Sequence, residues 1–137
     1  MQIKGLSEIA ARFDGMLIDQ FGVLHDGEKL YPGTLQVLDE LHRMKIPVVV
    51  MTNSGKRAAA NRDRLTRMGI PRSQFVDCMS SGEVAYGAQK VKTAFLIGKN
   101  GEDYGFDGIA FVEKPEEAEV ILILGSNTPA TSLDEYR

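Results

Sequence analysis

Short apolar runs alternate with amphipathic segments along the first half of the chain. Residues 15–19 form an apolar run that stops at Asp19, and residues 46–51 form a β-branched run that stops at Thr52. Between these runs, leucine and methionine recur at helical spacing over residues 34–44, behind a Pro-Gly-Thr start. The pattern predicts a strand, a helix and a second strand, with a carboxylate and a hydroxyl at the two strand ends.

The same alternation continues to the end of the chain. A short helix is predicted at residues 7–11, a second long helix at 56–68, which closes with a Gly and a Pro, and a third near 82–90. Further strands are predicted at residues 93–97, 109–112 and 120–124. Alternating strands and helices predict an α/β fold with a mostly parallel, right-handed, doubly wound sheet.

The two strand ends suggest a small site. Parallel neighbours present their carboxyl ends at one sheet edge, where ligands bind in such folds, so Asp19 and Thr52 are expected to face the same region. A carboxylate there serves as nucleophile, metal ligand or simple helix cap. Asn53 and Ser54 add backbone N–H groups at a helix start, where anions are favoured, although an ordinary helix cap explains them equally well.

A long irregular segment separates the first strand from its helix. Residues 21–33 hold three glycines and one proline and exceed the usual connection of about 4–6 residues, which hints at function. Asp26 and Gly27 are predicted to form a turn. His25 beside them is expected to be exposed to solvent.

Composition narrows the class of protein. The 137 residues are 43% hydrophobic and carry a formal charge of −3, a balance that disfavours a nucleic-acid partner. Cys78 is the single cysteine, so no internal disulfide forms, and a buried thiol is expected. No apolar run approaches the roughly 18 residues of a membrane span, so a cytoplasmic protein without a membrane partner is expected.

Three segments carry a resemblance to a known family. Residues 16–24 (MLIDQFGVL), 31–33 (YPG) and 48–54 (VVVMTNS) resemble the first two motifs of the haloacid-dehalogenase-like (HAD) hydrolases. Within them the chain looks like the class IIA group of nitrophenylphosphatase-like and sugar-phosphatase-like enzymes. The resemblance covers about residues 12–130. It implies a partial three-layer Rossmannoid sandwich, with an amino-terminal core half at 1–78 and part of an inserted α/β cap at 79–137.

The resemblance also implies a chemistry. Asp19 would attack a phosphorus atom to form an aspartyl-phosphate, and Mg²⁺ would be held by the Asp19 carboxylate and the Phe21 backbone carbonyl. Thr52 and the Asn53 amide would bind the transferring phosphoryl oxygens of a small phosphorylated metabolite. Arg57, near the start of the next helix, would contact the anionic substrate, although a surface role is the plainer interpretation.

A second register is possible for the first motif. Asp14, followed by Gly15, also imitates the end of that motif, in the position of its second aspartate. This register would place Arg12 where the nucleophile belongs and would require a strand in the helix-like residues 7–11. Asp19 is therefore the preferred nucleophile.

Two departures from the family pattern limit the expected activity. Phe21 stands where most members carry an aspartate that protonates the leaving group, and losing such a residue typically removes about 10²–10⁴ in rate. The later motifs, with their lysine and acidic metal ligands, have no counterpart in the 137 residues. We expect an incomplete, weakly active or inactive phosphatase, or a homo-oligomer; the alternatives are a non-catalytic phosphate-binding protein and a regulatory fragment without its own ligand.

Overall fold

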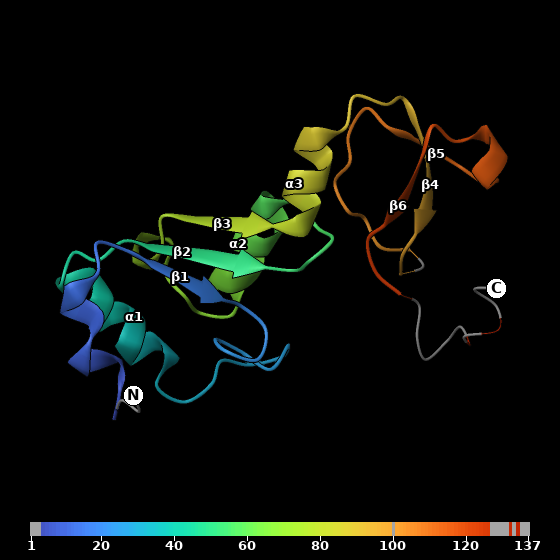
Figure 1. Ribbon diagram of the computed structural model, residues 1–137. Coiled ribbons are helices and arrows are strands. Elements are labelled where there is room, and N and C mark those ends of the chain that lie inside the picture. Colours follow the sequence, from blue (N-terminus) through green and yellow to red (C-terminus); the bar gives the residue numbers. More distant parts are fainter. Residues whose placement is uncertain (1–3, 100, 127–131, 133, 135–137) are drawn as a thin grey trace. The chain divides into compact units, whose positions relative to one another are not determined.

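The computed structural model describes residues 4–99, 101–126, 132 and 134 of the chain (Figure 1). It divides into two compact units. The first comprises Met1–Thr52 with Ala58–Met79, and the second comprises Asn53–Arg57 with Ser80–Arg137. The short segment Asn53–Arg57 is therefore separated in sequence from the rest of its unit. Whether the units correspond to the core half and the cap stays a prediction.

The elements follow one another in the alternating order that the sequence predicts. They are 3-10 turns at Leu6–Glu8 and Ala10–Arg12, β1 (Met16–Asp19), α1 (Thr34–Arg43), β2 (Val48–Thr52), α2 (Ala58–Arg67), a 3-10 turn at Arg72–Gln74, β3 (Asp77–Ser80), α3 (Ser81–Ala88), β4 (Thr93–Ile97), β5 (Ala110–Val112), a 3-10 turn at Pro115–Glu117 and β6 (Val120–Ile123). Two sheets result, in the orders β1-β2-β3 and β5-β4-β6. The expected α/β class with parallel sheets is confirmed.

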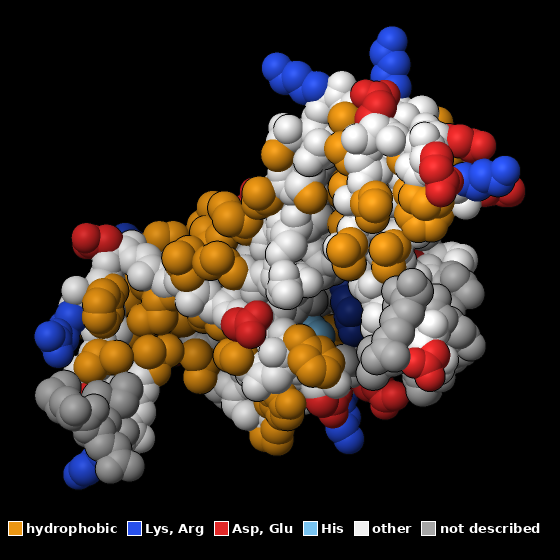
Figure 2. All heavy atoms as spheres, turned by 45° about the vertical axis from the view of Figure 1, so that its right-hand side comes forward, with side chains coloured by type: hydrophobic (Ala, Val, Ile, Leu, Met, Phe, Trp, Pro, Cys, Tyr) orange, Lys and Arg blue, Asp and Glu red, His pale blue; other side chains and the backbone are white. Residues whose placement is uncertain are grey.

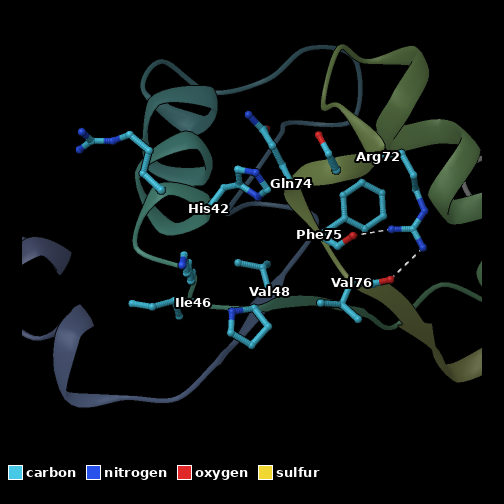
Figure 3. Close-up of a pocket in the computed structure, with 11 residues that line it drawn as sticks. His42, Ile46, Val48, Arg72, Gln74, Phe75 and Val76 are labelled. Atoms are coloured by element: carbon cyan, nitrogen blue, oxygen red, sulfur yellow. Dashed lines mark hydrogen bonds between the residues drawn. The ribbon is translucent and has the colours of Figure 1, made fainter.

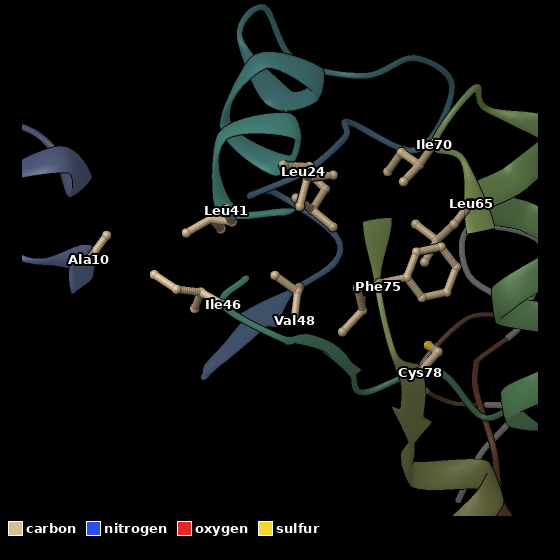
Figure 4. Close-up of a cluster of buried hydrophobic side chains, with 11 residues drawn as sticks. Ala10, Leu24, Leu41, Ile46, Val48, Leu65, Ile70, Phe75 and Cys78 are labelled. Atoms are coloured by element: carbon tan, nitrogen blue, oxygen red, sulfur yellow. The ribbon is translucent and has the colours of Figure 1, made fainter. Parts of the chain in front are cut away.

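One face of the first sheet carries the core of the first unit. Side chains alternate across a strand, so Val48 and Val50 of β2 and Cys78 of β3 point to the same side and are buried. Leu38 and Leu41, three residues apart on α1, and Leu65 of α2 pack into the same cluster (Figure 4). The helical spacing in the sequence therefore marks the faces that cover this side of the sheet.

The opposite face of the first sheet is apolar and uncovered within this unit. Leu17 of β1 is 71% exposed, and Met51 of β2 and Met79 of β3 are also exposed. Hydrophobic side chains gather on the outside of this unit (Figure 2). Parallel sheets are usually buried on both faces, so this surface is unusual for a fold of this kind.

The second unit has its own small core around a parallel sheet. β4 pairs with β5 on one side and with β6 on the other, and the centre is formed by Ala94, Tyr104, Phe106 and Leu122. Helix α3 starts with a side-chain N-cap, in which the Ser80 hydroxyl oxygen accepts from the Glu83 backbone N–H at 3.0 Å.

Three local expectations need correction. Residues 7–11 form parts of two 3-10 turns instead of one helix opening on Ser7, and the second long helix begins at Ala58 instead of residue 56. β3 was not predicted, because its four residues carry Asp77 and Ser80 and lack a long apolar run. None of the described helices is long and apolar enough to cross a bilayer.

Candidate functional site

The end of β1 and the end of β2 meet at one edge of the first sheet. In the parallel ladder Asp19 is the partner of Met51, which immediately precedes Thr52. The Gln20 N–H continues the ladder by donating to the Met51 carbonyl at 3.1 Å. The register thus places the predicted nucleophile Asp19 and the predicted phosphoryl-binding residue Thr52 at neighbouring strand ends. Their roles stay predictions.

The Asp19 carboxylate is exposed and oriented by its own neighbour. Its Oδ1 accepts from the Gln20 backbone N–H at 2.7 Å. Oδ2 has no hydrogen-bond partner among the described residues. Asp19 also lines a surface cavity of 480 Å³ along β1, whose other lining residues include Val23, Tyr31 and Val37. One carboxylate oxygen is therefore available to a ligand at an otherwise apolar surface.

The long loop after β1 is folded back on itself. The Gly22 N–H donates to the His25 carbonyl at 2.8 Å, and the Asp26 N–H donates to the Lys29 carbonyl at 3.1 Å. Leu24 is buried in the core and anchors the loop, since its carbonyl accepts from the Thr34 hydroxyl at 3.0 Å. The loop is thus a positioned element at the Asp19 edge.

The predicted turn at Asp26 and Gly27 is confirmed. Asp26 Oδ1 accepts from the backbone N–H groups of Glu28 and Lys29, both at 2.9 Å, and these hydrogen bonds lower the pKa of Asp26. Gly27 has a φ of 109°, which favours glycine. The turn closes the tip of the loop.

Phe21 presents its ring to solvent and has a backbone carbonyl that accepts no hydrogen bond from the described residues. The side chain is 64% exposed, and the ring meets the imidazole of His25 edge-on at 6.0 Å between centroids. A Cβ on Gly27 would lie 3.1 Å from the Phe21 ring, so the ring rests on the loop tip. The Phe21 carbonyl accepts no hydrogen bond from the described residues and is free to bind a cation.

His25 is buried, contrary to the expectation of solvent exposure. It is 1% exposed, and its Nδ1 accepts from the Gly27 N–H at 2.9 Å, which places the proton on Nε2. Nε2 has no hydrogen-bond partner among the described residues. Burial lowers the pKa of His25, the Arg64 guanidinium lowers it further, and Asp26 partly opposes both. The sequence missed this residue because a histidine beside a turn dipeptide gives no sign of burial.

Asn53 belongs to the second unit, where α3 holds it. Its Oδ1 accepts from the Ser81 hydroxyl at 2.5 Å, and the carbonyl of Ser54 accepts from the Gly82 N–H at 3.0 Å. A Cβ on Gly82 would lie 2.0 Å from the Gly55 carbonyl oxygen, so only glycine permits this approach. The segment after Thr52 is therefore built into the second unit rather than into α2.

Arg57 is engaged by side chains of its own unit. Its Nε and Nη2 donate to the two oxygens of Glu83 at 2.7 and 2.8 Å, and the guanidinium lies 3.6 Å from the ring centre of Tyr86. The hydrogen bond to Glu83 raises the pKa of Arg57. This bidentate geometry fixes the guanidinium. A substrate contact by Arg57 stays a prediction.

The fold and the strand-end carboxylate define an α/β protein of the kind that binds ligands at the carboxyl edge of a parallel sheet. The sequence profile of the haloacid dehalogenase-like hydrolases matches residues 16–136. The chain belongs to this family.

One solved structure agrees with the fold. The crystal structure of a haloacid dehalogenase-like hydrolase from Brucella suis 1330 matches with a TM-score of 0.83 and a sequence identity of 21%. The match covers 99% of this chain and 53% of the Brucella chain. A hypothetical protein from Pyrococcus horikoshii OT3 is 25% identical, with a TM-score of 0.49 over 65% of this chain and 36% of its own. No curated protein matches. The chain spans about half the length of the Brucella protein.

Proposed function

We propose that this chain carries the nucleophile half of a Mg²⁺-dependent phosphomonoester phosphatase of the class IIA type. The observation that carries the proposal is the register that sets Asp19 at the end of β1 beside Thr52 at the end of β2. The nucleophile and the phosphoryl-binding hydroxyl would then both act on one small phosphoryl group. Phosphoryl transfer depends mainly on such positioning and on stabilising negative charge.

Asp19 would act by nucleophilic catalysis. A carboxylate oxygen bonds to the phosphorus, the ester oxygen leaves with the electron pair, and water later cleaves the aspartyl-phosphate to release phosphate. The Gln20 N–H donates a hydrogen bond to Oδ1 of Asp19 and so holds the carboxylate in one orientation. Less orientational freedom is then lost when the nucleophile attacks. The Thr52 hydroxyl and the Asn53 amide would donate to the phosphoryl oxygens.

The residues at this edge fit Mg²⁺. The Asp19 carboxylate and the free Phe21 carbonyl are hard oxygen donors, and Mg²⁺ often uses one or two carboxylates while keeping several waters. When bound, Mg²⁺ would neutralise charge on the phosphoryl group. No cluster of three or more His, Cys, Asp or Glu suited to a metal occurs in the described part of the chain, so these two donors make a partial site.

Phe21 favours a second candidate function. Its ring can neither protonate a leaving group nor activate water, and it stands 64% exposed at the loop where the resemblance places the acid–base aspartate. A phosphate- or metabolite-binding protein on the same scaffold would use Thr52, Asn53 and the cation without turnover. We therefore expect either slow hydrolysis or binding alone.

The substrate would be a small phosphorylated metabolite. Because the chain spans about half of its Brucella relative, we propose that efficient turnover needs residues from a longer chain or a second copy. The cytoplasm is the proposed location, since the expected substrates are found there.

The test is Mg²⁺-dependent phosphate release from p-nitrophenyl phosphate and a panel of sugar phosphates. Release that stops with chelator and in Asp19→Asn, but continues in Asp14→Asn, supports hydrolysis through Asp19. Asp14→Asn is the matched control because it removes the carboxylate of the rejected register. Loss in Asp14→Asn alone would overturn the assignment.

Equilibrium binding of inorganic phosphate separates the two functions. If no variant releases phosphate and wild type and Asp19→Asn bind the ion equally, the binding protein is the better description. If neither binds nor hydrolyses, both proposals fail for this chain.

A further inference from the structure

A second cavity lies at the other end of the first sheet. It has a volume of 770 Å³ and is lined by residues 42, 43, 45–48 and 72–76, all in the first unit (Figure 3). These residues end α1, begin β2 and precede β3. Asp19 and Thr52 lie at the opposite, carboxyl ends of the strands. The cavity is therefore distinct from the proposed phosphoryl site, and its size is usual for small-molecule sites.

The lining of this cavity is positively charged. Arg43, Lys45 and Arg72 supply the positive charge, His42 also lines the cavity, and no aspartate or glutamate does, in a chain with a formal charge of −3. A cavity lined by one sign of charge concentrates oppositely charged ligands. The surface thus selects for an anion.

Two of the basic side chains are already engaged. Arg43 pairs with Glu40, and Arg72 donates to the carbonyls of Phe75 and Val76. Neither the His42 imidazole nor the Lys45 ammonium has a hydrogen-bond or ion-pair partner within the described part of the chain. These two groups are available to meet an anionic group.

Gln74 supplies an unused acceptor. It is 7% exposed, and its Nε2 donates to Asp39 Oδ1, whereas its Oε1 is buried without a partner among the described residues. Gln74 lines the cavity next to His42 (Figure 3). Buried polar atoms are nearly always hydrogen-bonded, so this oxygen is expected to accept a hydrogen bond from a further donor. The oxygen is buried, so an N–H or O–H group of a ligand would supply that donor after the Gln74 side chain turns toward the cavity.

The remaining wall is apolar and would contact a flat hydrophobic body. It is formed by Ile46, Pro47, Val48, Phe75 and Val76. Ligand sites commonly combine such an apolar lining with a few polar groups that fix orientation.

We propose that this cavity binds a small organic anion with an aromatic or similarly flat apolar body. Its negative group meets His42 and Lys45, its body lies on the apolar wall, and an N–H or O–H donates to Gln74 Oε1. The proposal does not depend on the phosphatase activity, because no residue of the Asp19 site takes part.

The backbone conformation of Lys45 makes it possible to separate an effect on ligand binding from an effect on stability. Lys45 follows α1 with a φ of 58°, a left-handed position that glycine usually occupies at a helix end. The Ile46 N–H donates to the Leu41 carbonyl at 3.0 Å and completes this helix-ending motif. Lys45→Gly should therefore relieve backbone strain while removing the ammonium group. Stability and ligand affinity are expected to move in opposite directions.

The probe is indole-3-acetate, which combines an anionic group, a flat ring and an N–H donor. The chain has no tryptophan, so indole emission reports the ligand alone in an anisotropy titration. We expect saturable binding that weakens about tenfold or more in Lys45→Gly, the loss of one charge-assisted contact. Lys45→Arg keeps the charge and should bind nearly as the wild type does.

Two ligand analogues test the other contacts. Indole-3-ethanol lacks the negative charge and 1-methylindole-3-acetate lacks the donor, so both should bind more weakly than indole-3-acetate. Thermal melting should show Lys45→Gly a few degrees more stable than the wild type. Absence of saturable binding, equal affinity for indole-3-ethanol, or unchanged affinity in Lys45→Gly would each overturn the proposal. Asp19→Asn should leave this binding unchanged.

Discussion

Asp19 and Met51 are partners in the parallel ladder of β1 and β2, which sets the end of β1 beside the end of β2. The relationship depends on register. A shift of one residue would turn Asp19 to the other face of the sheet, because side chains alternate along a strand. The buried positions Val48 and Val50 fix that register, so core packing determines where the candidate nucleophile points.

Phe21→Asp should raise Mg²⁺-dependent phosphate release by about 10²–10⁴-fold if the missing acid–base group limits turnover. The side chain is largely exposed, so the folded state should tolerate the change. Steady-state assays with p-nitrophenyl phosphate measure the effect. Val23→Asp, also exposed in the same loop, is the matched control and should have no such gain. An equal gain in both variants would contradict the role of position 21.

His25 should make the first unit sensitive to acid. Its pKa is lowered from 6.5 in the folded state, so the unfolded chain binds more protons below pH 6.5 and stability falls as the pH drops through the folded value. Protonation also removes the Nδ1 acceptor of the Gly27 N–H. Urea unfolding should give a lower unfolding free energy at pH 5 than at pH 7.5, with part of the difference due to this residue.

His25→Asn should reduce that loss, because asparagine does not titrate. The matched control is His42→Asn, which changes the one other histidine of the chain. An unchanged pH dependence in His25→Asn would show that other groups cause it.

Cys78 should be protected from alkylation and should couple stability to alkaline pH. The thiol is 2% exposed, and burial raises its pKa from 9.0 to about 11. Between these values the unfolded chain loses the proton first, so stability falls as pH rises from about 9 to 11. The contribution is roughly 3 kcal/mol. Unfolding curves of the wild type and Cys78→Ala across this range should converge as pH rises; parallel curves would contradict the prediction.

Arg57→Lys should destabilise the second unit, because lysine cannot reproduce the two parallel hydrogen bonds to Glu83 or the stacking on Tyr86. A loss of about 0.5–1.5 kcal/mol is expected for this partly exposed pair. Chemical unfolding followed by amide hydrogen exchange measures it. Arg43→Lys changes a more exposed Arg–Glu pair and should have no measurable effect. Equal losses in both variants would argue against a special role of Arg57.

Leu17→Lys should lower self-association of the chain. Leu17 stands 71% exposed on the uncovered apolar face of the first sheet, which is available for self-association, one of the two alternatives that the sequence left open. The unfolding free energy should change by less than about 0.5 kcal/mol. Sedimentation velocity over a range of concentrations measures the effect. Val84→Lys, an exposed apolar position on α3, is the control; an equal response there would show that the face is not specific.

The sequence by itself determined the elements that depend on local periodicity. The apolar runs before Asp19 and Thr52 became β1 and β2, and leucines at helical spacing became the buried face of α1. The parallel order followed from alternation alone, since short connections leave few arrangements of strands and helices. The sequence pattern alone therefore places the ends of these two strands at one edge of the sheet.

Only the tertiary structure decided the features that depend on distant contacts. His25 is buried because Arg64 and the core beneath Leu24 hold its loop, and the helix after Thr52 starts late because Asn53–Arg57 packs with α3. β3 forms because the neighbouring strand β2 supplies its hydrogen-bond partners. The four residues of β3 have no apolar pattern long enough to predict a strand. Local sequence encodes the period of an element, whereas burial and pairing depend on which surfaces the folded chain brings together.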